Sequence, residues 1–170
     1  MKVLGISGSQ RIGGNTTILL EEALKAIHGR VETELVALAD FGAPGHRADG
    51  KLDEVVEKMR QADAFLLATP SYFGMPPGRM VALLDATWED QRKGAFAAKA
   101  GAALAVESEW GGELAAQCLG HYFTAHRMLY LGYAVGRGLK EREILYDIKA
   151  IREARLLANR LADHLESKRR

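Results

Sequence analysis

Five short apolar runs alternate with helical patterns along this chain of 170 residues, and this alternation constrains the fold more than any other feature. The apolar runs predict strands at residues 2–6, 33–38, 64–68, 102–106 and 128–135. Apolar residues at helical spacing predict helices at residues 15–29, 55–59, 78–84, 114–123 and 148–165. Because the strands hold few polar residues and each is followed by a helix, we expect a parallel sheet covered on both faces. The sequence therefore predicts one doubly wound α/β domain that spans residues 1–170.

The turn after the first strand carries the residues of an anion site. Gly13 and Gly14 precede a helix that starts near Asn15, so free backbone N–H groups meet the positive end of the helix dipole there. The side chains that could donate hydrogen bonds to a phosphate are Ser7, Ser9, Arg11, Asn15, Thr16 and Thr17. The alternative is that these residues only cap the helix and shape the turn.

This turn differs from two common nucleotide-binding loops. A nucleotide-hydrolysing loop has Lys and then Ser or Thr after its second glycine, whereas Gly13 is followed by Gly14 and Asn15. The dinucleotide pattern Gly-x-Gly-x-x-Gly is also missing from this turn. The expected ligand group is therefore a phosphate monoester.

A second candidate loop, residues 69–78, follows the third predicted strand. It places the adjacent aromatic residues Tyr72 and Phe73 before Gly74. With the strand order 2-1-3-4-5, this loop faces the first one across the crevice where such sheets bind ligands. The aromatic rings could contact a planar ligand, or they could plug the open end of the sheet. A phosphate site opposite an aromatic loop predicts a ligand such as flavin mononucleotide (FMN).

The two loops resemble those of a known family. Residues 8–16 read Gly-Ser-x-Arg-x-x-Gly-Asn-Thr, and residues 69–74 read Thr-Pro-x-Tyr-Phe-Gly. Both are similar to segments of the NADPH-dependent FMN reductases, which have a flavodoxin-like fold. A third segment, residues 106–112, stands where members of that family have a loop that closes over the flavin. The resemblance covers nearly the whole chain and implies the five-stranded sheet order 2-1-3-4-5.

The resemblance also implies a cofactor and a reaction. The first loop would hold the FMN phosphate, with Ser7 near the ribityl chain. The residues that would line the flavin ring are Pro70, Tyr72, Phe73, Gly74, Met75, Glu107, Ser108, Trp110, Gly111 and Gly112. Glu107 is an unexpected acidic residue there, and Trp110 could instead belong to the core. Hydride would pass from NADPH or NADH to FMN, and then to a flavin, a quinone or another small acceptor, with no catalytic nucleophile from the protein.

Cysteine content separates this chain from a close branch of the family. The iron–sulfur flavoproteins carry a cysteine cluster in the loop after the second strand, whereas residues 41–50 hold no cysteine. Cys118 is the sole cysteine of the sequence, and we expect it to pack in the core. His46 has no second ligand at metal-binding spacing, so we predict no metal site.

Charge and hydropathy exclude two classes of partner. The formal net charge is +1, and the basic cluster at residues 168–170 suits the end of a helix better than a nucleic acid. The first apolar run is too short for a signal peptide, and no run has the length of a membrane span. We therefore expect a cytoplasmic protein without nucleic-acid or membrane partners.

Three alternative functions predict other features of the sequence, and the family resemblance predicts an assembly. An FMN-containing electron-transfer flavoprotein acting between protein partners would need an acidic docking surface, which the balanced charge does not indicate. A quinone reductase usually has a longer insertion near the fourth strand. A chain that kept the fold and lost the flavin is a further alternative. By analogy with the family we expect a homodimer or homotetramer, with contacts around Met75, Met80 and Trp88.

Overall fold

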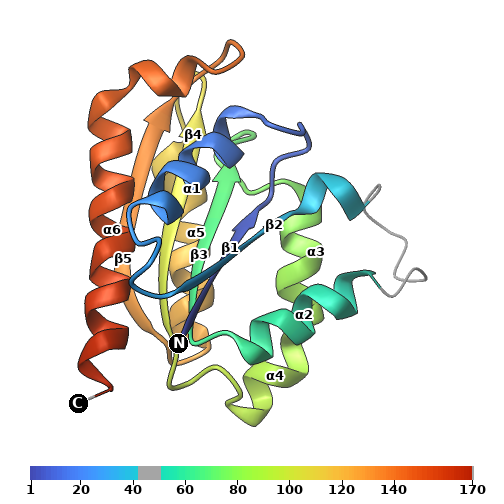
Figure 1. The fold of residues 1–170 in the computed structure, drawn as a ribbon. Helices are drawn as coiled ribbons and strands as arrows, with labels where there is room; N and C mark the ends of the chain where they lie inside the picture. Colours follow the sequence, from blue (N-terminus) through green and yellow to red (C-terminus); the bar gives the residue numbers. More distant parts are fainter. Residues whose placement is uncertain (42–50, 170) are drawn as a thin grey trace.

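The computed structural model describes residues 1–41 and 51–169, which form a five-stranded parallel sheet with helices on both faces (Figure 1). The strand order is β2-β1-β3-β4-β5, as predicted. The strands are β1 (Lys2–Ser7), β2 (Glu32–Ala37), β3 (Ala64–Pro70), β4 (Ala100–Glu107) and β5 (Leu129–Arg137). The helices are α1 (Asn15–Lys25), α2 (Lys51–Gln61), α3 (Gly78–Ala86), α4 (Trp88–Lys93), α5 (Gly112–Ala125) and α6 (Ile148–Ser167), with short 3-10 turns η1 (Leu38–Phe41) and η3 (Glu143–Tyr146).

Side-chain alternation along the strands builds one apolar layer on each face of the sheet. In β3, Leu66 and Ala68 pack toward α1 and α6, whereas Phe65 and Leu67 pack toward α2, α3 and α5. Every residue of β3 is buried because the strand lies in the middle of the sheet, with helices on both sides. This sandwich makes the sheet a rigid platform for the loops at its edges.

The parallel register brings four strand ends to one edge of the sheet. Ser7 is paired with Ala68, Pro70 with Val106, and Glu107 with Arg137. The loops after β1 and β3 therefore face each other, as predicted. The Gly8 N–H joins them by donating a 2.8 Å hydrogen bond to the Ala68 carbonyl.

Three sequence-based expectations need correction. Helix α1 ends at Lys25 rather than at Gly29, because a tight turn precedes the positive-φ Gly29. Cys118 is partly exposed on α5 rather than packed in the core, and Met80 is fully buried, so it cannot form a surface contact. His46 and the loop around it lie outside the described residues.

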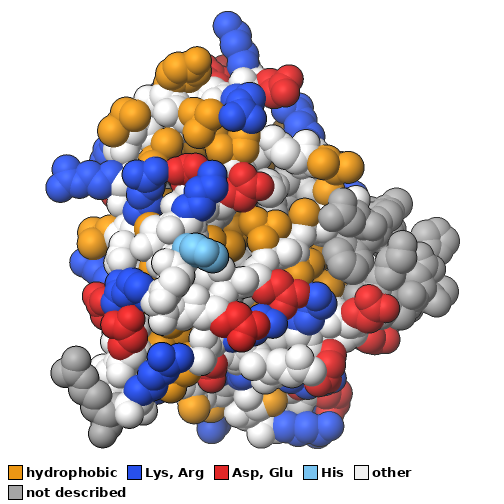
Figure 2. All heavy atoms as spheres, viewed as in Figure 1, with side chains coloured by type: hydrophobic (Ala, Val, Ile, Leu, Met, Phe, Trp, Pro, Cys, Tyr) orange, Lys and Arg blue, Asp and Glu red, His pale blue; other side chains and the backbone are white. Residues whose placement is uncertain are grey.

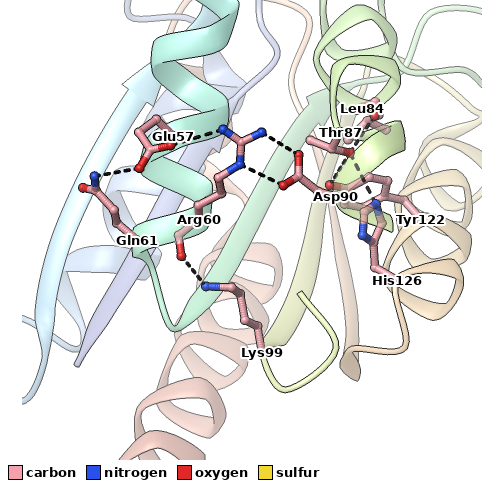
Figure 3. Close-up of polar contacts among 9 residues, drawn as sticks. All are labelled: Glu57, Arg60, Gln61, Leu84, Thr87, Asp90, Lys99, Tyr122 and His126. Carbon is pink, nitrogen blue, oxygen red and sulfur yellow. Dashed lines mark hydrogen bonds and ion pairs between the residues drawn. The ribbon is translucent and has the colours of Figure 1, made fainter. Parts of the chain in front are cut away.

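The short helix α4 was missed by the sequence analysis. Its residues Trp-Glu-Asp-Gln-Arg-Lys show no apolar periodicity, and the helix ends at Gly94 in the left-handed conformation. Its position depends on a buried carboxylate: Asp90 accepts hydrogen bonds of 2.8 and 3.0 Å from the Arg60 guanidinium (Figure 3). Tertiary contacts, rather than local pattern, therefore place this helix.

A polar cluster at the amino end of the sheet surrounds this ion pair (Figure 3). The Thr87 hydroxyl donates to the Leu84 carbonyl and lies within hydrogen-bond distance of Tyr122 and His126. Burial raises the pKa of the Tyr122 hydroxyl and lowers the pKa of the His126 imidazole. Both groups are therefore neutral at physiological pH.

Candidate functional site

Four loops at the carboxyl end of the sheet enclose a cavity of about 140 Å³. It is lined by Ser9, Arg11, Gly14, Asn15, Thr16, Pro70, Ser71, Tyr72, Val106, Glu107, Ser108, Gly138 and Leu139. Pockets for whole drug-sized ligands are about 300–1,000 Å³. The cavity therefore has room for one part of a larger ligand, while the rest must lie against the surrounding surface.

The first turn of α1 presents backbone donors to this cavity. Gly14 caps the helix without a side-chain hydrogen bond, and the first helical bond runs from the Ile18 N–H to the Gly14 carbonyl. The N–H groups of residues 15–17 thus have no acceptor among the described residues. With the positive end of the helix dipole, they form a site for an anion.

The hydroxyl of Ser9 shapes the loop before the helix. It accepts a 3.0 Å hydrogen bond from the Arg11 N–H and lies 3.2 Å from the Arg11 carbonyl. The Arg11 side chain is exposed and lines the cavity, and no described residue forms an ion pair with its guanidinium. This guanidinium is free to bind an anion in the cavity.

Two of the predicted phosphate ligands lie behind the cavity. The hydroxyls of Ser7 and Thr17 are 2.8 Å apart, and both residues are buried. Neither residue lines the cavity. Their mutual hydrogen bond holds the end of β1 against the first turn of α1, which suggests a supporting position.

Asn15 connects two loops of the site. Its Nδ2 donates a 2.8 Å hydrogen bond to the Lys140 carbonyl, and its Oδ1 accepts one of 3.4 Å from the Ile144 N–H. Both ends of the amide are therefore engaged with the segment after β5. What Asn15 offers to the cavity from the helix is its backbone N–H.

The loop after β3 forms a tight turn with exposed aromatic side chains. Tyr72 and Met75 exchange two backbone hydrogen bonds, of 3.0 and 2.9 Å, around Phe73 and Gly74, which both have positive φ. Phe73 is 91% exposed and Tyr72 is 41% exposed. Phe73 is therefore not a plug for the sheet, and the turn instead holds its ring out in solvent.

The loop after β4 packs directly on this aromatic turn. Gly111 has a φ of 86°, and a Cβ atom there would lie 2.9 Å from the Gly74 Cα. Only glycine allows the two loops to approach so closely. Trp110, which follows Glu109 in the same loop, is 61% exposed and so is not a core residue.

The contacts of the Glu107 carboxylate explain why this loop holds an acidic residue. Its Oε2 accepts a 2.8 Å hydrogen bond from the Gly112 N–H at the start of α5, and Arg137 lies 3.5 Å from its Oε1. The helix dipole and the guanidinium offset the negative charge. Glu107 therefore organises the loop between β4 and α5.

Sequence analysis missed three residues that line the cavity. The Ser71 hydroxyl is buried and has no hydrogen-bond partner among the described residues. Gly138 and Leu139 belong to a loop after β5 that carries no aromatic or phosphate-binding motif. The glycines at 136 and 138 were the signal available, since a Cβ at Gly138 would lie 2.7 Å from the Asn15 Nδ2.

The surface charge is mixed in sign (Figure 2), and the described residues offer no metal-binding group. Figure 2 shows acidic and basic side chains interspersed over the face viewed there. Within residues 1–41 and 51–169, no group of three His, Cys, Asp or Glu side chains is arranged to hold a metal ion. None of the described helices combines the length and apolar composition needed to cross a membrane.

Comparisons with known proteins agree with the geometry. Residues 1–139 match the family NADPH-dependent FMN reductase. An iron–sulfur flavoprotein of Methanocaldococcus jannaschii is 36% identical over 147 residues, covering 78% of this chain and 76% of that protein. The solved structure of the Trp repressor binding protein from Bacillus subtilis has a TM-score of 0.73 and 26% identity, covering 91% of this chain and 96% of that chain.

A solved NADH:FMN oxidoreductase (EMOB), in its apo form, has a TM-score of 0.66 and 25% identity, covering 91% of this chain and 88% of that chain. The likeness to an iron–sulfur flavoprotein does not extend to a cysteine cluster, because this sequence has one cysteine and a typical cluster needs four thiolates. The chain is an α/β protein of flavodoxin-like fold that belongs to the NADPH-dependent FMN reductase family of oxidoreductases.

Proposed function

We propose that this chain binds FMN at the carboxyl end of the sheet and uses NADPH or NADH to reduce a flavin, a quinone or another small acceptor. The observation that carries the proposal is the anion site at the start of α1, which faces an exposed aromatic turn across one cavity. This pairing matches a ligand with a phosphate at one end and a planar ring at the other.

The donor set of the first loop fits a terminal phosphate. The N–H groups of residues 15–17 and the guanidinium of Arg11, which find no partner in the described part of the chain, would hold its oxygens. Thr16 lines the same cavity and can add a hydroxyl donor. Ser7, Ser9 and Thr17 would support the loop through the hydrogen bonds described above.

The remaining loops fit the ring and the ribityl chain. Tyr72, Phe73, Gly74 and Met75 would form one part of the ring site, and residues 107–112, which pack on that turn, would form the adjoining part. Ser71 lines the cavity, and its buried hydroxyl has no hydrogen-bond partner among the described residues, so a polar ligand atom would satisfy it. The described residues therefore fit FMN.

When bound, FMN would supply the chemistry of accepting a hydride and donating two electrons. The protein would contribute positioning: the α1 terminus and Arg11 anchor the phosphate, and the two glycine-containing turns hold the ring site in shape. The charge of Glu107 is already offset by the start of α5 and by Arg137, so it would add little repulsion.

We further propose a homo-oligomer in which a second copy covers part of the open site. Met75 is 54% exposed and Trp88 is 64% exposed, and both lie on the side of α3 and α4. Sedimentation of the flavin-loaded protein at micromolar concentration should give at least a dimer. A monomer there would exclude this assembly without affecting the proposed cofactor.

The function is tested by visible absorbance of the purified protein under anaerobic conditions. Addition of FMN should give a bound-flavin spectrum, and NADPH or NADH should then bleach it, with recovery when a quinone is added. FMN-loaded protein that stays oxidised with both nicotinamides would refute the reductase activity. An electron carrier between protein partners would then be the better interpretation.

A further inference from the structure

We infer that residues 138–142, the loop between β5 and η3, form a braced wall that selects a flavin monophosphate over a flavin whose phosphate is joined to a second phosphate, such as FAD. The inference rests on the proposed FMN site and assigns its selectivity to residues outside the two recognised loops. Gly138 and Leu139 line the cavity beside the start of α1. We call residues 138–142 the wall loop.

The first brace is the side chain of Asn15. Its amide makes hydrogen bonds with the Lys140 carbonyl, inside the wall loop, and with the Ile144 N–H, two residues after the loop ends. The amide also packs against Gly138, where a Cβ would lie 2.7 Å from Nδ2. The same residue that starts α1 therefore fixes how far the wall loop stands from the anion site.

The second brace is the carboxylate of Glu143. Its Oε2 accepts hydrogen bonds of 2.7 Å from the Leu139 N–H and 2.8 Å from the Lys140 N–H. These bonds hold the pKa of the Glu143 carboxyl below its usual value. Glu143 does not line the cavity, so its effect on a ligand can act only through the wall loop.

The wall loop is also tied to the sheet. The Gly138 N–H donates a 2.9 Å hydrogen bond to the Glu107 carbonyl at the end of β4. Residues 138–140 thus make hydrogen bonds to three separate parts of the protein: α1, β4 and the start of η3. The wall loop can therefore move only if several of these hydrogen bonds break.

Selectivity follows from this rigidity. A phosphate monoester ends at the anion site, whereas the phosphate of FAD continues through a phosphoanhydride bond into an adenylate. The cavity has only about 140 Å³, and Gly138 and Leu139 close part of it. An adenylate leaving past them would have to displace the wall loop and break its hydrogen bonds.

The test measures dissociation constants of the full-length apoprotein for FMN, FAD and riboflavin, with flavin fluorescence as the signal. The variants are Glu143→Ala and Asn15→Ala. The matched control is Glu141→Ala, which removes one negative charge two residues away from Glu143 and breaks no hydrogen bond that the structure shows within the described residues. Amide exchange at residues 139 and 140 reports directly whether the wall loop has loosened.

The wild type should bind FMN at least about tenfold more tightly than FAD, and both variants should lower that ratio by about fivefold or more. Riboflavin affinity should stay unchanged, and Glu141→Ala should keep the wild-type ratio. The amides of residues 139 and 140 should exchange faster in Glu143→Ala than in the control.

Three results would overturn the inference. An unchanged FAD-to-FMN ratio in Glu143→Ala would show that the wall loop does not select. Equal weakening of FMN and FAD in Asn15→Ala, with riboflavin unaffected, would make Asn15 a phosphate ligand rather than a brace. Equal weakening of all three ligands would indicate a general loss of structure. A wild type that binds no flavin would instead refute the proposed function itself.

Discussion

The two ends of the sheet differ in how many polar groups have hydrogen-bond partners within the protein. At the amino end, Asp90 is 4% exposed and both its oxygens are paired with Arg60, while Thr87 joins Tyr122 and His126 (Figure 3). At the carboxyl end, the N–H groups that start α1, the Arg11 guanidinium and the Ser71 hydroxyl have no partner among the described residues. Hydrophobic side chains are exposed there as well.

This difference predicts which substitutions change stability and which change ligand binding. Buried polar groups that are paired within the protein stabilise the folded state. Removing one partner leaves the other buried and unpaired, which costs free energy. A donor without a partner adds no stability, and a buried one costs free energy until a ligand binds it. Substitutions at the amino end should therefore change the free energy of unfolding, and those at the carboxyl end should change affinity.

The largest effect is expected from Asp90→Ala. It removes both hydrogen bonds between Asp90 and the half-exposed Arg60, which keeps its exposed partner Glu57, and should lower the free energy of unfolding by about 2 to 3 kcal/mol. FMN affinity should stay within about twofold. The control is Glu89→Ala in the same helix, whose exposed pair with Arg92 should contribute less than about 1 kcal/mol. Urea unfolding measures both, and similar losses would contradict the contrast.

Arg11→Ala tests the other end. It should weaken FMN binding by about 1.5 to 3 kcal/mol, or roughly ten- to a hundredfold, since a hydrogen bond to a charged group is lost. Riboflavin affinity and the free energy of unfolding should not change. Arg152→Ala, on the exposed face of α6, controls for net charge. Unchanged FMN affinity would leave phosphate binding to the backbone N–H groups alone.

Ser71→Ala sharpens the contrast with a smaller change. Loss of one hydrogen bond to the ligand should cost about 1 kcal/mol of affinity. The loss should be the same for FMN and riboflavin, because we assign Ser71 to the ring or ribityl part. Stability should not fall, since the hydroxyl has no partner within the described residues to lose. A loss of stability without a loss of affinity would show that the Ser71 hydroxyl stabilises the fold and does not bind the ligand.

The smallest expected effect is the contribution of His126 to the pH dependence of the free energy of unfolding. Its Nδ1 is buried and has no hydrogen-bond partner in residues 1–41 and 51–169. Burial lowers the pKa of the imidazole, against an opposing influence from Asp90. The unfolded chain then takes up a proton first, so this contribution to stability is complete above pH 6.5 and is lost as the pH falls through the lowered pKa.

Urea midpoints at pH 7.5 and 5.5 should therefore differ more for the wild type than for His126→Phe. His164, whose pKa is also lowered, should account for part of the slope that remains. Equal slopes in the two proteins would show that His126 does not titrate with unfolding.

The fold was predictable because its signal is repeated. Each strand is a short apolar run and most helices show an apolar face, so the class and the order of the elements follow from local pattern. Helix α4 was missed because its one buried residue, Asp90, is charged and depends on Arg60 from another helix. Likewise Met80 could not be recognised as buried, since α3 is apolar on more than one face.

The lining of the cavity was predictable in part, for a similar reason. The loops after β1 and β3 carry distinctive residues, and the parallel topology brings them together. The wall loop carries no such motif, and its place in the site depends on hydrogen bonds to Asn15 and Glu143. A side chain such as Asn15, which sequence analysis assigns to the phosphate, can bond elsewhere once the chain is folded.

The central claim, that FMN binds at the carboxyl end of the sheet, is tested most directly by NMR. Backbone amide spectra of the labelled protein are recorded with increasing FMN. The account predicts shifts in residues 9–17, 71–75, 107–112 and 138–140, with little change at Arg60, Thr87 and His126. Shifts concentrated around those three residues, or no shifts at saturating FMN, would contradict it.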